Sequence, residues 1–226
     1  MRHNHDEALS LIRKTKLVAI LRGVPAERVD GVVEALLAGG VRVLEFTFDH
    51  MRKDCVAANA AIIRHAVERF GDRAIIGCGT CLSPEEAEAA YAAGAVLVIT
   101  PNVDEAVIRR ARDLGMVAMP GAMTPTEIAA AWRYGADIVK LFPAGELGLS
   151  YIKAVRGPLC HIPLAAVGGV QPENVSEFLS AGVCGFGVGG PLVLKDAVKS
   201  GDYPAIEARA KAFTEAIASW EAGYGE

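Results

Sequence analysis

Short apolar runs and longer helical patterns alternate along the whole of this 226-residue chain. Each run is rich in Val, Ile or Leu and lacks strict alternation, which is typical of parallel strands covered on both faces. Helix start signals such as Ser83-Pro84-Glu85 and Thr124-Pro125-Thr126-Glu127 separate the runs, and several helices end in glycine. The predicted strands are Leu17–Leu21, Val41–Thr47, Ala74–Cys78, Val96–Thr100, Met116–Met119, Ile138–Phe142, Pro163–Val167 and Cys184–Val188.

Eight strand–helix units in a chain of this length predict a single (β/α)8 TIM-barrel domain over residues 1–226. Additional helices, at Glu7–Thr15 and Tyr203–Trp220, are expected to cap or extend the barrel. A doubly wound open sheet is the alternative. No G-x-G-x-x-G follows the first apolar run, however, which disfavours dinucleotide binding and with it the open sheet.

Charge and cysteine content narrow the classes of function. The net charge of −4 provides no basic surface for nucleic acid, and 52% hydrophobic residues suffice for a large core. Five scattered cysteines do not form a disulfide framework. The start of the chain has no apolar signal region, and no apolar stretch is long enough to span a membrane. We therefore expect a cytoplasmic protein without nucleic-acid or membrane partners.

The ends of the predicted strands carry polar or conformationally special residues. Barrel enzymes place their sites at the C-terminal ends of the strands. Polar side chains that end several different strands are hard to explain as core packing, so we predict that they line one mouth. These residues are Arg22, Glu45, Thr47, Gly79, Thr80, Thr100, Pro101, Asn102, Pro120, Gly121, Lys140, Phe142, Gly168, Gly169, Gly189 and Gly190.

Lys140 closes an otherwise apolar run, and a buried amine is costly unless it is paired or used. Burial lowers the pKa of a lysine, and the free amine can then attack a ketone and form a Schiff base. A carboxylate such as Glu45 would move protons during imine formation and in the adjacent carbon–carbon step. The structural alternatives are that Lys140 reaches water or pairs with Asp137, or that Glu45 is only its ion-pair partner.

Two glycine pairs, Gly168-Gly169 and Gly189-Gly190, follow the last two predicted strands. Barrels commonly bind phosphate at these loops, with backbone N–H groups and the start of a helix, here near Pro172. Turns also require glycine, so one pair alone is a weak signal. Two pairs at both positions favour an anion pocket.

The order and spacing of these motifs resemble the 2-keto-3-deoxy-6-phosphogluconate / 4-hydroxy-2-oxoglutarate (KDPG/KHG) aldolase family over nearly the whole chain. The resemblance implies a class I aldolase on a (β/α)8 barrel, free of metals and cofactors, homotrimeric, and releasing pyruvate from a 2-keto-4-hydroxy acid. The motifs that carry it are Glu45-Phe46-Thr47, Gly77-Cys78-Gly79-Thr80, Thr100-Pro101-Asn102, Met119-Pro120-Gly121, Asp137-Ile138-Val139-Lys140-Leu141-Phe142-Pro143 and Val167-Gly168-Gly169-Val170.

The resemblance also implies roles for individual residues. Lys140 falls on the Schiff-base lysine, Glu45 on the general acid/base, and Thr80, with Arg22 as a further candidate, near the substrate carboxylate. The remaining matches are with the walls and the distal end of the pocket: Pro101, Phe142, Gly168, Gly169, Gly189 and Gly190.

Two positions depart from the phosphogluconate-cleaving members of that family. Asp49 stands where they usually carry arginine, and Pro191 stands where they often carry serine. Arg22, Arg52 or a partner subunit could supply the missing positive charge. The imine chemistry is unaffected, but the identity of the substrate tail stays open. The alternatives are a phosphate-binding barrel isomerase or synthase without an imine, and a non-catalytic trimeric relative.

Overall fold

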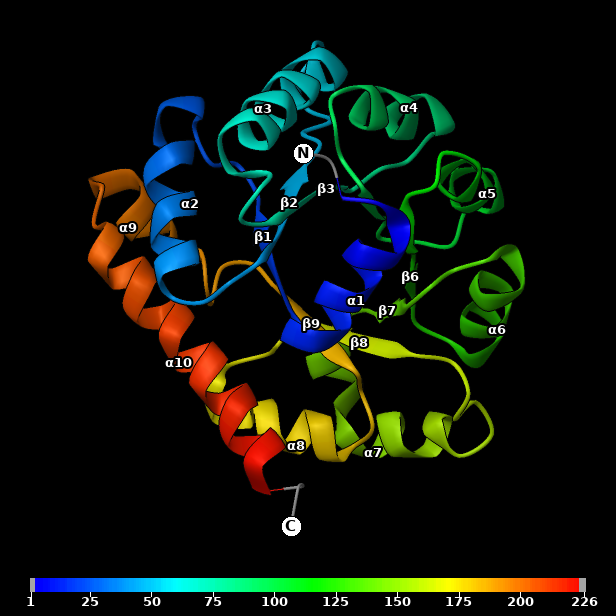
Figure 1. The fold of residues 1–226 in the computed structure, drawn as a ribbon. Helices are drawn as coiled ribbons and strands as arrows, with labels where there is room; N and C mark the ends of the chain where they lie inside the picture. Colours follow the sequence, from blue (N-terminus) through cyan, green and yellow to red (C-terminus); the bar gives the residue numbers. More distant parts are fainter. Residues whose placement is uncertain (1–2, 224–226) are drawn as a thin grey trace.

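The computed structural model, which describes residues 3–223, is a parallel β-barrel surrounded by helices (Figure 1). The strands pair in the order β5-β4-β3-β2-β1-β9-β8-β7-β6, and every pair is parallel. The predicted barrel class is confirmed. The strands are β1 (Leu17–Leu21), β2 (Val43–Thr47), β3 (Ile75–Gly79), β4 (Leu97–Ile99), β5 (Val117–Met119), β6 (Gly121–Ala122), β7 (Val139–Leu141), β8 (Leu164–Val167) and β9 (Gly185–Val188).

The fifth predicted strand, Met116–Met119, corresponds to β5, and the unpredicted two-residue strand β6 follows it after Pro120, which explains why nine strands replace eight. Proline has no N–H to offer to a ladder. Its carbonyl nevertheless accepts a hydrogen bond from Lys140 N at 2.9 Å, and Ala118 O accepts one from Asp137 N at 2.9 Å. These bonds join β5 and its extension to the β7 segment and close the barrel.

The helices begin where the sequence signals predict. Ser83 Oγ accepts a hydrogen bond from Glu86 N at 3.3 Å, and Thr124 forms a complete capping box with Glu127. Gly135 ends α6 in the left-handed region at φ 105°. The helices around the barrel are η1 (Ala26–Arg28), α2 (Val29–Ala38), α3 (Cys55–Phe70), α4 (Pro84–Ala92), α5 (Glu105–Asp113), α6 (Pro125–Tyr134), α7 (Ala144–Arg156), η2 (Pro172–Asn174), α8 (Val175–Ser180), α9 (Lys195–Ser200) and α10 (Tyr203–Gly223).

Helix α1 (His5–Thr15) closes the N-terminal end of the barrel, as Figure 1 shows. Its Ala8 and Ile12 are buried among the inward residues of the strands, such as Val43 and Ile75. At the same end, the buried Asp137 accepts hydrogen bonds from Ala118 N and Arg112 Nη1, each at 2.9 Å, and lies 3.1 Å from His5 Nε2. Only the C-terminal end of the barrel is therefore left for a site.

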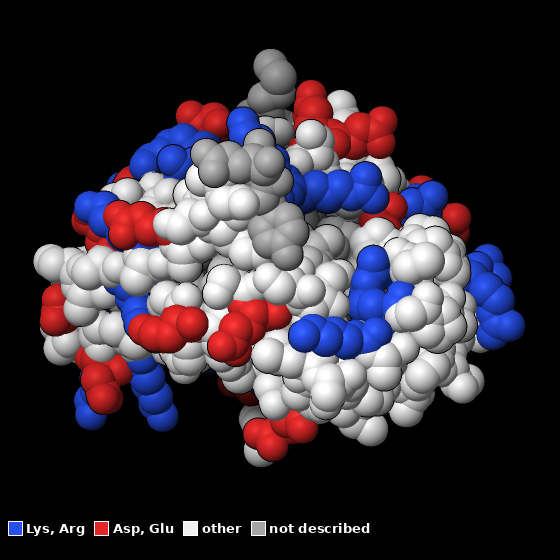
Figure 2. Space-filling view, turned by 90° about the horizontal axis from the view of Figure 1, so that it is seen from below, with Lys and Arg blue, Asp and Glu red and all other residues white. Residues whose placement is uncertain are grey.

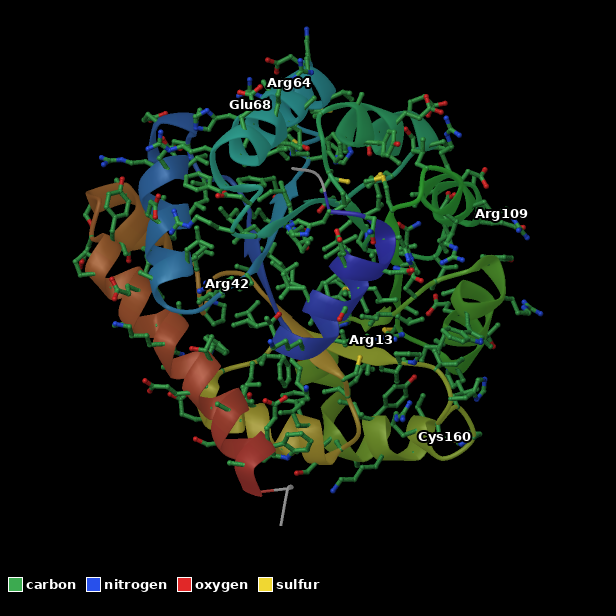
Figure 3. The ribbon with its side chains drawn as sticks, in the orientation of Figure 1. Arg13, Arg42, Arg64, Glu68, Arg109 and Cys160 are labelled. Atoms are coloured by element: carbon green, nitrogen blue, oxygen red, sulfur yellow. The ribbon has the colours of Figure 1, made fainter. Side chains whose placement is uncertain are left out.

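Helix α10 runs along the outside of α2 and α8, and its last turn pairs with the start of β1 through Glu221 and Lys16. Charged side chains such as Arg64, Glu68 and Arg109 point outward from the helix ring (Figure 3). On the face drawn in Figure 2, basic and acidic groups are intermixed. Across residues 3–223, no helix combines the length and the apolar character that a membrane crossing requires.

Candidate active site

Lys140 lies at the centre of β7 with its side chain inside the barrel, where it is only 6% exposed. Its Nζ is 5.1 Å from the centroid of the Phe142 ring and makes no hydrogen bond or ion pair with another residue in the described range. Burial lowers the pKa of Lys140; the nearby Arg22 lowers it further, and the Glu45 carboxylate opposes both. The amine thus has the Phe142 ring as its neighbour but no hydrogen-bond or ion-pair partner in the described range, and its surroundings favour its neutral, nucleophilic form.

Glu45 lies at the centre of β2, beside Ile20 of β1 and Gly77 of β3, and is 1% exposed. Its Oε2 has no hydrogen-bond partner. Burial raises the pKa of Glu45 to about 7, although Lys140 and Arg22 both act to lower it. A carboxyl group with this pKa can both accept and donate a proton near neutral pH.

The described part of the chain shows no ion pair between Lys140 and Glu45. The structural alternative that Glu45 merely neutralises the lysine is therefore not what the geometry displays. Nor does Asp137 pair with Lys140, because Asp137 is engaged with Arg112 and His5 at the closed end. The two central groups influence each other's pKa through space without forming an ion pair.

Gly79 creates the space that the Glu45 carboxyl group occupies. A β-carbon at Gly79 would lie 1.6 Å from Glu45 Oε1, far inside van der Waals contact. Only glycine is compatible with this arrangement. The sequence signal was present, since a glycine within a strand marks a close approach of another group, but it did not reveal which group approaches.

Arg22 and Thr80 meet at the mouth of the barrel. Arg22 Nη2 donates to Thr80 Oγ1 at 3.2 Å, across from the end of β1 to the turn after β3. Thr80 has a φ of 55°, a left-handed conformation that is uncommon for a residue other than glycine. The exposed Arg22 guanidinium keeps most of its donors available for an anion.

Arg52, the second candidate for the missing positive charge, does not take this role in the structure. Its Nε and Nη2 donate to the two carboxylate oxygens of Asp54, at 3.0 and 2.8 Å. Asp49 accepts a hydrogen bond from Met51 N at 3.1 Å within the same loop. Arg22 therefore remains the candidate of the two.

The distal loops lie together at the C-terminal ends of β8 and β9. The pairing of Val167 with Gly187 places Gly168-Gly169 next to Gly189-Gly190. Gly168 and Gly169 have φ values of 91° and 74°, which only glycine adopts readily. Beyond Lys140, Phe142 is 41% exposed, and Pro101 lies half-buried at the end of β4.

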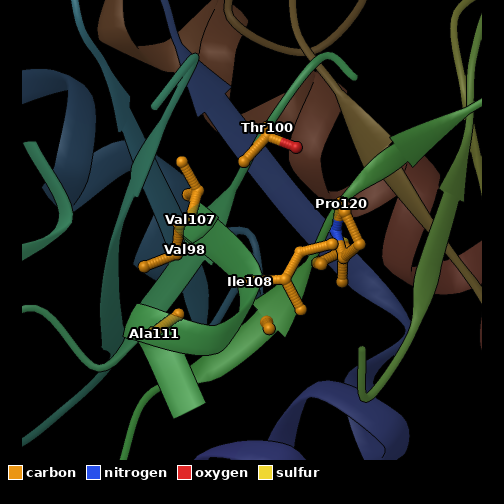
Figure 4. Close-up of a pocket in the computed structure, with 8 residues that line it drawn as sticks. Val98, Thr100, Val107, Ile108, Ala111 and Pro120 are labelled. Atoms are coloured by element: carbon orange, nitrogen blue, oxygen red, sulfur yellow. The ribbon is translucent and has the colours of Figure 1, made fainter. Parts of the chain in front are cut away.

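Figure 4 shows a small space elsewhere, between β4, β5 and α5. Its lining is almost entirely apolar, so it is part of the core packing and holds no chemistry. Among residues 3–223, no three His, Cys, Asp or Glu side chains come together as metal ligands would. The residues that line the space are Val98, Thr100, Val107, Ile108, Ala111, Ala118, Met119 and Pro120.

A partnerless buried amine and a proton-exchanging acid, facing one mouth of a parallel barrel, define the class of imine-forming barrel enzymes. Comparison with known proteins identifies the family within that class. A family model described as KDPG and KHG aldolase matches residues 9–209. The chain belongs to this aldolase family, as the sequence motifs predicted.

Individual relatives agree with this family. The 2-dehydro-3-deoxy-6-phosphogalactonate aldolase of Escherichia coli (strain K12) is 37% identical over 207 residues, covering 90% of this chain and 97% of that protein. The KHG/KDPG aldolase of the same strain is 31% identical over 220 residues, covering 95% and 98%. A solved structure described as native KDPGal has a TM-score of 0.80 at 35% identity, over 90% of this chain and 95% of that one. These relatives are carbon–carbon lyases of the aldolase type.

Proposed function

We propose that Lys140 and Glu45 carry out class I aldolase chemistry, in which a 2-keto-4-hydroxy acid is cleaved reversibly to pyruvate and an aldehyde. The observation that carries this proposal is the placement of a buried, partnerless lysine opposite a buried acid whose pKa is raised to about 7. Membership of an aldolase family supports the same chemistry.

Lys140 begins the reaction as the nucleophile. Its neutral amine attacks the C2 ketone, and the resulting carbinolamine loses water to form an iminium ion. The iminium then serves as an electron sink. When the C3–C4 bond breaks, its electron pair moves into the C2–C3 bond and the iminium electrons return to nitrogen, which gives an enamine.

Glu45 moves the protons that these steps require. As a carboxylate it accepts the proton of the C4 hydroxyl while the aldehyde leaves. As the acid it returns that proton to C3 of the enamine and regenerates an iminium. Water then adds to the iminium and releases pyruvate and the free lysine. The unpaired Oε2 is the atom available for this exchange.

Arg22 and Thr80 are proposed to bind the carboxylate of the pyruvyl half. The glycine loops after β8 and β9 are proposed to bind the distal end of the substrate through backbone N–H groups. Relatives at similar identity are named for phosphogalactonate, phosphogluconate and hydroxyoxoglutarate substrates, which supports the class of substrate rather than one member of it.

We further propose a cytoplasmic homotrimer. The described cysteines are all free, and Cys160 is exposed on the outer rim, which suits a reducing compartment (Figure 3). Large apolar side chains outside the mouth are also exposed, as expected for a chain that associates: Leu82, Met123 and Trp132.

Borohydride trapping tests the proposed function. Incubation with pyruvate and borohydride should reduce the imine to a stable secondary amine, and peptide mass spectrometry should place it on Lys140. Lys140→Ala should abolish the adduct, whereas Lys153→Ala, on the exposed face of α7, should leave it intact. Labelling of Lys140→Ala at the level of the parent would refute the mechanism. Absence of trapping in the parent, together with binding of phosphate esters, would favour an isomerase or synthase instead.

A further inference from the structure

The side chain of Arg209, on α10, donates hydrogen bonds to both loops at the distal end of the site. Its Nε donates to Pro191 O, in the loop after β9, at 2.9 Å. Its Nη2 donates to Gln171 Oε1, in the loop after β8, and its Nη1 lies 3.5 Å from Glu173 Oε1. The guanidinium also lies 5.4 Å from the centroid of the Phe213 ring. The Arg209 side chain is half-buried, and these contacts fix the position of its guanidinium group.

On the side of Gln171, the hydrogen bonds continue from Arg209 to the first glycine pair. Gln171 N donates to Asn174 Oδ1 at 2.9 Å, and Asn174 Nδ2 donates to Gly169 O at 3.0 Å. In a trans peptide the N–H points opposite to the C=O. With the Gly169 carbonyl directed to Asn174, the Val170 N–H is therefore directed the other way, and it donates to no other residue in the described range.

On the side of Pro191, the hydrogen bonds continue from Arg209 to the second glycine pair. Arg209 holds the carbonyl of Pro191, and the Leu192 N–H of the same peptide donates to Gly189 O at 2.9 Å. The Gly189 carbonyl is thereby directed inward within its own turn. The Gly190 N–H, on the opposite side of that peptide, has no partner among the described residues.

We propose that Arg209 is a positioning residue for the distal end of the substrate. It joins the two loops so that the free N–H groups of Val170 and Gly190 are presented together to an anionic group. The inference rests on the proposed function for the identity of the anion, a terminal phosphate or carboxylate. Among residues 3–223 no other side chain makes hydrogen bonds to both loops, so without the arginine the donors lose the link that fixes their spacing.

The test compares Arg209→Met with a matched control, Arg156→Met. Arg156 Nη1 donates to Leu159 O and Ile162 O, so it also ties a loop through backbone carbonyls, but after α7 at the start of β8. For Arg209→Met we expect the KM for 2-keto-3-deoxy-6-phosphogluconate, and the Kd for inorganic phosphate, to rise by about tenfold or more. Borohydride trapping of pyruvate, which does not reach the loops, should stay within about twofold of the parent.

Arg156→Met should lower the melting temperature without this selective rise in KM. The proposal is overturned if Arg209→Met binds phosphate as the parent does, or if pyruvate trapping falls in parallel with substrate affinity. If Arg209→Met does not fold, Gln171→Ala removes the hydrogen bond between Arg209 and the loop after β8 and should show a smaller rise in KM. An unchanged KM would then overturn the proposal. Failure of the proposed function is separate, because it would appear as absence of trapping in the parent.

Discussion

Replacing Gly79 by alanine tests whether the position of the Glu45 carboxyl group carries the chemistry. A β-carbon at Gly79 would lie 1.6 Å from Oε1, 2.1 Å from Cδ and 2.5 Å from Cγ of Glu45. Carbon and oxygen atoms need about 3.5 Å, so the carboxyl group would have to retreat by about 2 Å. A misplacement of about 1 Å can already cost about 10²-fold in rate. Loss of general acid–base catalysis costs about 10²- to 10⁴-fold.

We therefore expect Gly79→Ala to lower kcat for pyruvate release by about 10²- to 10³-fold. Pyruvate release coupled to NADH oxidation by lactate dehydrogenase gives kcat and KM, and urea unfolding gives the stability. Gly77→Ala, two residues earlier on β3, is the matched control. Its β-carbon would lie 2.8 Å from Leu97 Cβ, and its three nearest atoms all belong to Leu97. Both variants overpack the barrel and should lose about 1–3 kcal/mol of stability.

Only Gly79→Ala should combine that loss with the fall in kcat. If it folds and keeps kcat within about threefold of the parent, the carboxyl group has no need of its observed position, and the assignment of Glu45 is wrong. An equal loss of kcat in both variants would show that general overpacking, rather than displacement of Glu45, is responsible.

Two further predictions concern stability. Burial raises the pKa of Glu45 from 4.5 to about 7, so the folded state binds this proton more tightly than the unfolded state does. Protonation of Glu45 therefore stabilises the folded state fully below pH 4.5, and this contribution is lost as the pH rises through about 7. Glutamine does not titrate, so the free energy of unfolding of Glu45→Gln, measured with urea, should rise relative to that of the parent by up to about 3 kcal/mol between about pH 4.5 and 8. A difference between the two proteins that does not change with pH would contradict this prediction. At the closed end, Asp137→Asn weakens the contacts with Arg112 and His5 and should lower the free energy of unfolding by about 1–2 kcal/mol, measured by thermal unfolding. The value of kcat should stay unchanged. A variant with full stability and a lower kcat would contradict the structural role of Asp137.

Lys140 and Glu45 could be singled out from the sequence because each is a charged residue near the end of an otherwise apolar predicted strand. The structure places both further back than expected, at the centres of β7 and β2, with their side chains buried. The first strand was predicted with its observed bounds, Leu17–Leu21. The additional strand after Pro120 was not foreseen, since a strand of two residues, Gly121–Ala122, has no pattern of its own.

Contacts between distant segments lay beyond the sequence patterns. Nothing local connects Arg209 with Pro191 and Gln171, which meet only because α10 returns to the last two loops. Asp137 illustrates the same limit. Its nearness to Lys140 in the chain allowed a pair, but the alternation of β7 and the arrival of α5 and α1 direct it to other partners.

The closure of one end of the barrel by α1 has a practical consequence for labelling or immobilising this protein. His5 begins the helix that covers the closed end, and Glu221, near the other end of the described chain, pairs with Lys16 beside it. A label or tether attached beside the start of α1 or beside Glu221 would therefore lie on the side opposite the mouth. Immobilised at either of these positions, the protein would present its open face to the solution and leave the path of the substrate unobstructed.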